Sequence, residues 1–129
     1  MDLRIEQVSL LVRDYDEAAA WFTSILGFIV VEDSRLSDTK RWVRLQPPGS
    51  GTTTILLSMA NTAEQMQAVG NQAGGKVFLF LYTDDIERDH KQLKENNVKI
   101  EKPLSTMEYG KVLVFSDLYG NKWDLIERV

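Results

Sequence analysis

Apolar and polar positions alternate over short stretches of this chain, and two longer stretches repeat their apolar residues at helical spacing. Residues 5–12 (IEQVSLLV) alternate and predict a strand with one face on a hydrophobic core. Asp14 then occupies an N-cap position, and Gly27 supplies a C-terminal stop, so residues 15–26 are predicted to form a helix.

The same order of elements recurs later in the chain. The first helix is followed by predicted strands at 28–33, 39–46 and 52–59, and then by a polar, glycine-containing connector at 61–75. A strand at 76–82, a helix within 83–98 capped by Thr83 or Asp84, and strands at 98–103, 111–117 and 122–129 complete the pattern. Each half reads strand, helix and three strands, which indicates an internal duplication. We therefore predict an α+β fold of two tandem βαβββ modules, at about 1–60 and about 76–129.

Composition places this pattern in an ordinary soluble domain. The chain has 129 residues, of which 43% are hydrophobic and 26% charged, as expected of one globular domain. A net charge of −4 argues against a nucleic-acid partner, because phosphate binding needs a basic surface. No apolar run approaches the roughly 20 residues of a membrane span, and the first residues lack signal-peptide features. A cytoplasmic location is the expectation.

The scarcity of soft ligands limits the chemistry further. The chain has no cysteine and a single histidine, His90, so thiolate sites and sites built on several imidazoles are excluded. Any metal would be held by carboxylates, amides and water, a donor set that favours magnesium or manganese over zinc.

Three segments carry a resemblance to a known family. The segments are VRDYDEAAAWFTSILGF, LYTDDIERDHKQLKENNVKI and VFSDLYGNKWDLIE. Together they resemble the vicinal oxygen chelate superfamily, which includes glyoxalase I, bleomycin-resistance proteins, fosfomycin-resistance enzymes and extradiol dioxygenases. Leu118 and Tyr119 stand where the family's turn usually has proline and aspartate. The resemblance implies two curved mixed sheets that pair into a cleft, helices on the outer faces, and a homodimer.

The resemblance also marks four positions where catalytic relatives bind a divalent metal. They fall on Gln7, near Leu57, on Val77 or Phe78, and on Asp124. Only the Gln7 amide and the Asp124 carboxylate are able to coordinate a metal, so we expect no metal, or at most a weakly held divalent ion on these two. The favoured reading is a cleft without cofactor in which Gln7 and Asp124 hydrogen-bond an organic ligand or one another. The alternative is that both are solvated groups at the cleft mouth.

Aromatic and cationic side chains add further candidates. Strand alternation places Arg41 and Val43 on one face and Trp42 and Arg44 on the other. Trp42 and Arg44 together suit a flat anionic ligand, whereas the alternative puts Trp42 in the core and Arg44 on its rim, or both at a dimer contact. Tyr109, in the loop MEYG, is a candidate to bring a phenol over the cleft, and an exposed surface tyrosine is the other reading.

Two functions of different class follow. One is a non-enzymatic protein that binds an aromatic or amphipathic small molecule, as in the bleomycin-resistance branch. The other is a metal-dependent lyase, isomerase or transferase of the glyoxalase I or fosfomycin-resistance type. The apolar residues at two of the four ligand positions favour the first.

Overall fold

The structure, a computed structural model, describes all of residues 1–129 and contains the duplicated order of elements. The first half consists of β1 (Gln7–Val12), α1 (Tyr15–Leu26), β2 (Ile29–Arg35), β3 (Arg41–Gln46) and β4 (Thr54–Met59). After a short helix, α2 (Ala63–Ala68), come β5 (Val77–Tyr82), α3 (Ile86–Glu95), β6 (Ile100–Met107), β7 (Gly110–Ser116) and β8 (Lys122–Arg128). The predicted α+β fold of two βαβββ modules is confirmed. The chain divides into two compact units, Met1–Val69 and Gly70–Val129.

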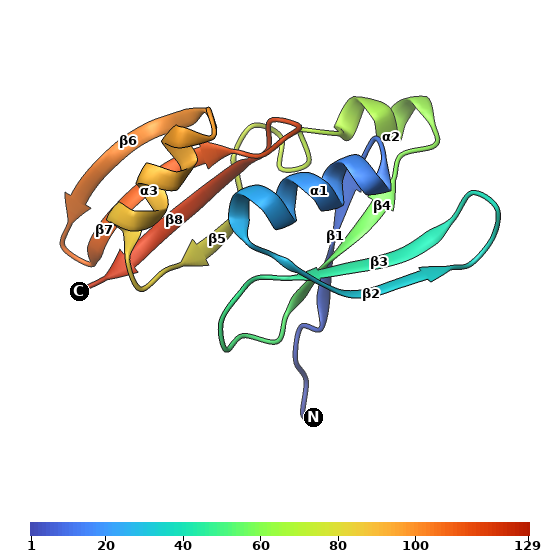
Figure 1. Cartoon of the computed structure of the whole chain (residues 1–129), viewed down its shortest axis with the longest axis horizontal. Helices are drawn as coiled ribbons and strands as arrows, with labels where there is room; N and C mark the ends of the chain where they lie inside the picture. The colour runs from blue at the N-terminus through green and yellow to red at the C-terminus, as the bar shows by residue number, and fades with distance from the viewer. The chain divides into compact units, whose positions relative to one another are not determined.

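Each unit contains one four-stranded mixed sheet, and the two sheets have equivalent strand orders (Figure 1). In the first unit the order is β1-β4-β3-β2, with β1 and β4 parallel and the other neighbours antiparallel. In the second unit the order is β5-β8-β7-β6, again with one parallel pair, β5 and β8. The first and last strands of each module therefore lie side by side, and the expected mixed sheets are confirmed.

The core of the first unit lies between α1 and one face of its sheet. Phe22 of α1, Leu10 of β1 and Leu45 of β3 are each fully buried there. The Asp14 side chain accepts a hydrogen bond from the Glu17 backbone N–H at 2.7 Å, so the predicted N-cap is present. The helix ends at Gly27, whose φ of 70° is one that glycine adopts without strain.

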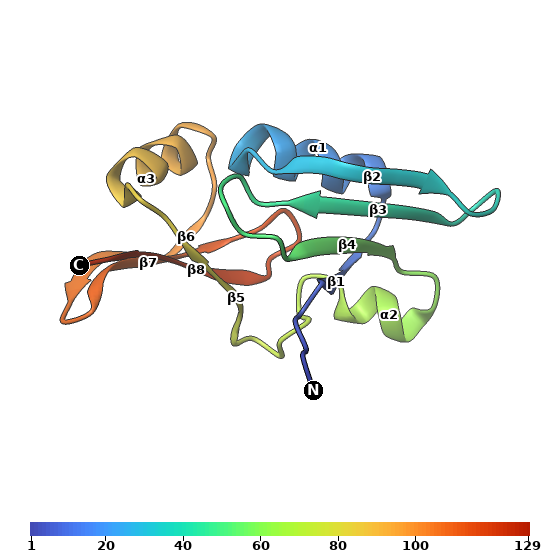
Figure 2. The same cartoon turned by 90° about the horizontal axis from the view of Figure 1, so that it is seen from below.

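The core of the second unit lies between α3 and its sheet (Figure 2). The buried residues Ile86 and Leu93 of α3 lie on the same side as Trp123 of β8, whose ring stacks on Phe115 with centroids 6.2 Å apart. The N-cap is Asp85, which accepts from the Arg88 N–H at 3.1 Å, and the expectation of Thr83 or Asp84 is wrong.

No helix of the chain is both long and apolar enough to cross a membrane.

Two segments differ from the sequence expectation. The connector holds the six-residue helix α2, capped by Thr62 and without a single buried residue, so it has no amphipathic pattern to recognise. Strand β6 runs past Pro103 to Met107, beyond the predicted end at 103. It is an edge strand, and Pro103 falls where its pairing with β7 shifts register, which is where a strand tolerates proline.

Candidate functional site

Strand β3 directs its side chains alternately toward α1 and away from it. Val43 and Leu45 are 1% and 0% exposed on the side of α1, whereas Trp42 and Arg44 are partly exposed on the other side. We call the side turned away from α1 the distal face of the first sheet; it carries Gln7, Trp42, Arg44, Thr54 and Leu56. Trp42 is therefore not buried in the core of this unit, which leaves the ligand-contact and dimer-contact readings of this strand.

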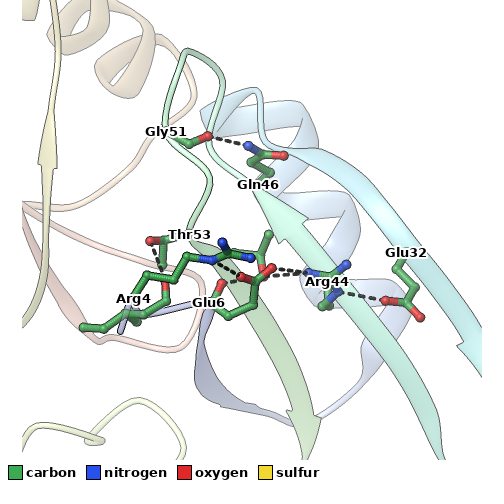
Figure 3. Close-up of polar contacts among 9 residues, drawn as sticks. Arg4, Glu6, Glu32, Arg44, Gln46, Gly51 and Thr53 are labelled. Atoms are coloured by element: carbon green, nitrogen blue, oxygen red, sulfur yellow. Dashed lines mark hydrogen bonds and ion pairs between the residues drawn. The ribbon is translucent and has the colours of Figure 1, made fainter. Parts of the chain in front are cut away.

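Arg44 lies at the centre of a network of charged and polar groups (Figure 3). Its Nε donates to Glu32 Oε1 at 2.8 Å, and its Nη1 donates to Thr54 Oγ1 at 3.3 Å and lies 4.0 Å from Glu6 Oε1. The Arg44 side chain is 23% exposed, so the close Glu32 carboxylate forms a partly desolvated, charge-assisted hydrogen bond. The positive charge of Arg44 is thus compensated within the chain.

Neighbouring backbone groups hold this network in place (Figure 3). The Thr54 N–H donates to the Glu6 carbonyl at 3.0 Å, and the Thr53 hydroxyl donates to the Ile5 carbonyl at 3.1 Å. The Gln46 side-chain amide donates to the Gly51 carbonyl and ties β3 to the loop that leads into β4. The sequence reasoning missed the partners Glu6, Glu32 and Thr54, because only the strand register brings them to Arg44.

Gln7 lies on the distal face at the start of β1, paired across the sheet with Thr54. Its side chain is half-exposed and makes no hydrogen bond within the chain, so its amide oxygen and nitrogen are available to a ligand. Leu57, placed by the sequence reasoning near the corresponding position of β4, is 1% exposed on the α1 side, opposite Leu10. The residues of β4 that share the face of Gln7 are Thr54, Leu56 and Ser58, none of which carries a carboxylate.

Asp124 lies on β8 in the second unit, on the face of that sheet turned away from α3. Its neighbours across the sheet are Phe80 on β5 and Val114 on β7. Burial raises the pKa of the Asp124 carboxyl above the ordinary aspartate value of 3.8, and the positive charge of Lys102 opposes that shift. The carboxylate makes no hydrogen bond or ion pair within the chain, so its desolvation is not offset by a direct partner.

This environment predicts a pH-dependent effect of Asp124→Asn. A carboxyl whose pKa is raised by folding stabilises the native state below its unfolded pKa, and this contribution is lost as pH rises through the folded pKa. Asparagine does not titrate, so the Asp124→Asn variant lacks this pH-dependent contribution to stability. Urea denaturation at pH 3.5 and pH 7 is therefore expected to show Asp124→Asn gaining stability relative to wild type at the higher pH. Asp38→Asn, at an exposed loop carboxylate, is the matched control, and an equal difference at both pH values would contradict the assignment.

The remaining predicted residues are in the second unit. Val77 is paired with Lys122, and Phe78 packs its ring edge-on against Trp123 with centroids 6.0 Å apart. Both side chains are hydrocarbons, so neither offers a ligand atom. Tyr109 is 54% exposed in the turn between β6 and β7. Its carbonyl accepts from the Val129 N–H at 3.2 Å, and its phenol makes no hydrogen bond within the chain.

The side chains at the expected metal positions do not fit a tightly held divalent ion. The available donors are one amide, Gln7, and one carboxylate, Asp124, which belong to different units. Neither unit contains a group of three or more histidine, aspartate or glutamate side chains arranged to hold a metal. Hard cations such as magnesium need several oxygen ligands, which this donor set does not supply.

Two mixed βαβββ sheets, each with a helix on one face, define the class of fold. A family model described as the Glyoxalase/Bleomycin resistance protein/Dioxygenase superfamily matches residues 4–125. The chain belongs to this superfamily, as its sequence resemblance predicted.

Individual relatives share the whole length of the chain. A protein of Shewanella frigidimarina described as uncharacterized is 44% identical over 128 residues, covering 98% of this chain and 95% of its own. The crystal structure of a superfamily member from Sphaerobacter thermophilus has a TM-score of 0.75 and 27% identity, covering 98% of each chain. The crystal structure of TnmS3, an antibiotic binding protein from Streptomyces sp. CB03234, has a TM-score of 0.80 and 23% identity. The match covers 99% of this chain and 98% of TnmS3. At that identity the likeness to TnmS3 concerns the fold.

Proposed function

We propose that this chain is a small-molecule-binding protein whose ligand contacts the distal face of the first sheet without a metal or other cofactor. The observation that carries the proposal is the combination of a partly exposed indole, Trp42, with an unengaged amide, Gln7, on one sheet face. An aromatic side chain supplies a large contact area, and a few polar groups fix the orientation of the ligand. Leu56 adds apolar surface between them.

The charges on this face favour a ligand that is planar and largely uncharged. Arg44 already hydrogen-bonds Glu32 at 2.8 Å, so an anionic ligand would have to displace that carboxylate. Glu6 is in turn paired with Arg4 at 3.0 Å. Because the positive charge of Arg44 and the negative charge of Glu6 are both compensated within the chain, ligand binding rests on stacking against Trp42 and on hydrogen bonds to Gln7. This modifies the expectation that Arg44 pairs with an anion.

The family supports a binding role of this kind. Bleomycin-resistance proteins give the superfamily part of its name, and TnmS3, whose fold is shared, is described as an antibiotic binding protein. A planar antibiotic or a related secondary metabolite is therefore the ligand class we propose. The superfamily name and TnmS3 support this class of ligand, and a screen of compounds identifies the member that binds.

Truncation of Trp42 provides the test. We expect a thermal-shift screen of planar polycyclic antibiotics that carry little net charge to yield at least one stabilising compound. Calorimetry with that compound should then show Trp42→Ala weakening binding by about tenfold to a hundredfold, because the stacking surface is lost. Trp42→Phe, which keeps an aromatic ring, is the matched control and should lose less. A compound that binds Trp42→Ala as tightly as wild type would refute the placement of the site.

The oligomeric state and location complete the proposal. We propose a cytoplasmic homodimer, supported by the superfamily membership and by three consecutive exposed apolar residues on the edge strand β2. These residues, Ile29, Val30 and Val31, are 55%, 44% and 42% exposed. Light scattering coupled to size-exclusion chromatography should give twice the chain mass, and a monomer at micromolar concentration would contradict the dimer.

A further inference from the structure

A separate hollow lies in the second unit, where β5 and β8 end. It has a volume of about 430 Å³ and is lined by Tyr82, Thr83, Asp84, Glu127 and Arg128. This volume falls within the range of about 300–1,000 Å³ typical of small-molecule sites. The hollow shares no residue with the distal face of the first sheet, so it needs its own explanation.

Three of the five lining side chains are engaged with neighbours in the same unit. Asp84 accepts from Arg88 Nη2 at 2.8 Å, and this hydrogen bond holds the pKa of the Asp84 carboxyl below its usual range. Glu127 Oε1 accepts from the Ile86 N–H at 2.8 Å, at the N-terminus of α3, where a carboxylate is favoured by the helix dipole. The Thr83 hydroxyl donates to Asp89. These groups are held by the fold.

Arg128 and Tyr82 are different, because their polar groups have no partner in the chain. The Arg128 guanidinium carbon lies 4.4 Å from the centroid of the Tyr82 ring, a stacking distance for a cation over an aromatic face. Neither the guanidinium N–H groups nor the Tyr82 hydroxyl forms a hydrogen bond or ion pair within the chain. The stack orients the planar fork of the guanidinium and leaves its N–H edge open.

We propose that this hollow binds a small aromatic carboxylate, with the carboxylate accepting two hydrogen bonds from Arg128 and the aromatic ring lying along the Tyr82–Arg128 stack. A planar guanidinium presents parallel donors that match a carboxylate, and its face packs against aromatic rings. Asp84 accepts from Arg88 and Glu127 accepts from the Ile86 N–H, and neither carboxylate forms an ion pair with Arg128 in the structure.

Naphthalene-2-carboxylate is the probe for this site, and naphthalene-2-carboxamide is its uncharged counterpart. Titrations followed by amide chemical shifts in nuclear magnetic resonance should show the carboxylate perturbing residues around Tyr82 and Arg128, with the carboxamide binding at least about tenfold more weakly. Arg128→Gln should weaken carboxylate binding by a similar factor and remove the preference for the charged probe. Arg128→Lys should fall between, since it keeps the charge and loses the fork.

An arginine-to-glutamine substitution far along the chain from Arg128 gives the control. Arg35→Gln, on strand β2 of the first unit, should leave binding unchanged, and Trp42→Ala should do the same. Thermal melting of Arg128→Gln should lie close to that of wild type, because Arg128 is exposed, makes no hydrogen bond or ion pair, and stacks on Tyr82 only at the surface. The proposal is overturned if the carboxylate does not bind at millimolar concentration, if the two probes bind equally, or if folded Arg128→Gln binds the carboxylate as wild type does.

Discussion

Asp117→Ala is expected to lower the free energy of unfolding by about 3–5 kcal/mol, the largest effect of any polar substitution in the chain. Asp117 is 6% exposed, in the turn between β7 and β8. Its Oδ1 accepts from the backbone N–H groups of Tyr119, Gly120 and Asn121 at 2.9–3.0 Å. Its Oδ2 accepts from Asn121 Nδ2 at 3.1 Å and from Trp123 Nε1 at 3.0 Å. Alanine would remove this acceptor in a buried place, although the Gly120 N–H would keep the backbone carbonyl of residue 117 as a partner.

The loss of stability extends to the core because Trp123 is one of the donors that Asp117 accepts from. Trp123 is 1% exposed and packs against Phe115 and Phe78, so the hydrogen bond that its indole N–H donates to Asp117 fixes the orientation of the largest side chain of the second core. Urea denaturation followed by circular dichroism measures the effect. Asp38→Ala, at an exposed aspartate, should change stability by no more than about 0.5 kcal/mol. A loss below about 1 kcal/mol for Asp117→Ala would contradict a structural role for this carboxylate.

Gly110→Ala is expected to cost about 2–4 kcal/mol, because the backbone and its surroundings both exclude a side chain. Gly110 has a φ of +145°, which L-residues with a side chain rarely adopt. A Cβ atom built there would lie 2.1 Å from the Glu127 carbonyl oxygen and 3.0 Å from the Arg128 Cα. Since these are backbone atoms, β7 and β8 would have to separate at this end of the sheet.

Gly51→Ala is the matched control for this glycine. A Cβ atom at Gly51 meets nothing within 4 Å, and its φ is not in the left-handed region. The substitution should be neutral or slightly stabilising, because it reduces the conformational entropy of the unfolded chain. Equal melting temperatures for Gly110→Ala and Gly51→Ala would show that β7 and β8 tolerate a side chain at Gly110, against the geometry described here.

The fold was largely predictable because its signals are local. Alternation in strands such as β1 and the cap at Asp14 each depend on a few adjacent residues, and the second module repeats the order of the first. Helix α2 was missed because it buries nothing and therefore has no periodic apolar face. The cap of α3 was misplaced because Thr83, Asp84 and Asp85 are all good capping residues and only the backbone geometry selects Asp85.

The site was less predictable because it depends on pairing between distant segments. Alternation was sufficient to put Trp42 and Arg44 on one face, but the compensation of Arg44 requires Glu32 and Glu6, which are brought to it by strand register and chain path. The same dependence applies to β4, where pairing puts Leu57 opposite Leu10 on the α1 side and its neighbour Leu56 on the distal face, because adjacent residues of a strand point to opposite faces. The Tyr82–Arg128 stack likewise joins residues from two strands whose proximity the sequence does not reveal.

Calorimetric titration of the chain with its tightest antibiotic ligand, after treatment with EDTA, tests the central claim of metal-independent binding most directly. The account predicts one affinity that is unchanged by adding manganese, magnesium, nickel or zinc and is weakened by Trp42→Ala. Gln7→Ala should weaken it by loss of a hydrogen bond, whether or not metal is added. Binding that disappears with EDTA, returns with one divalent metal, and loses this metal dependence in Gln7→Ala or Asp124→Ala would contradict the account and indicate a metal-dependent site.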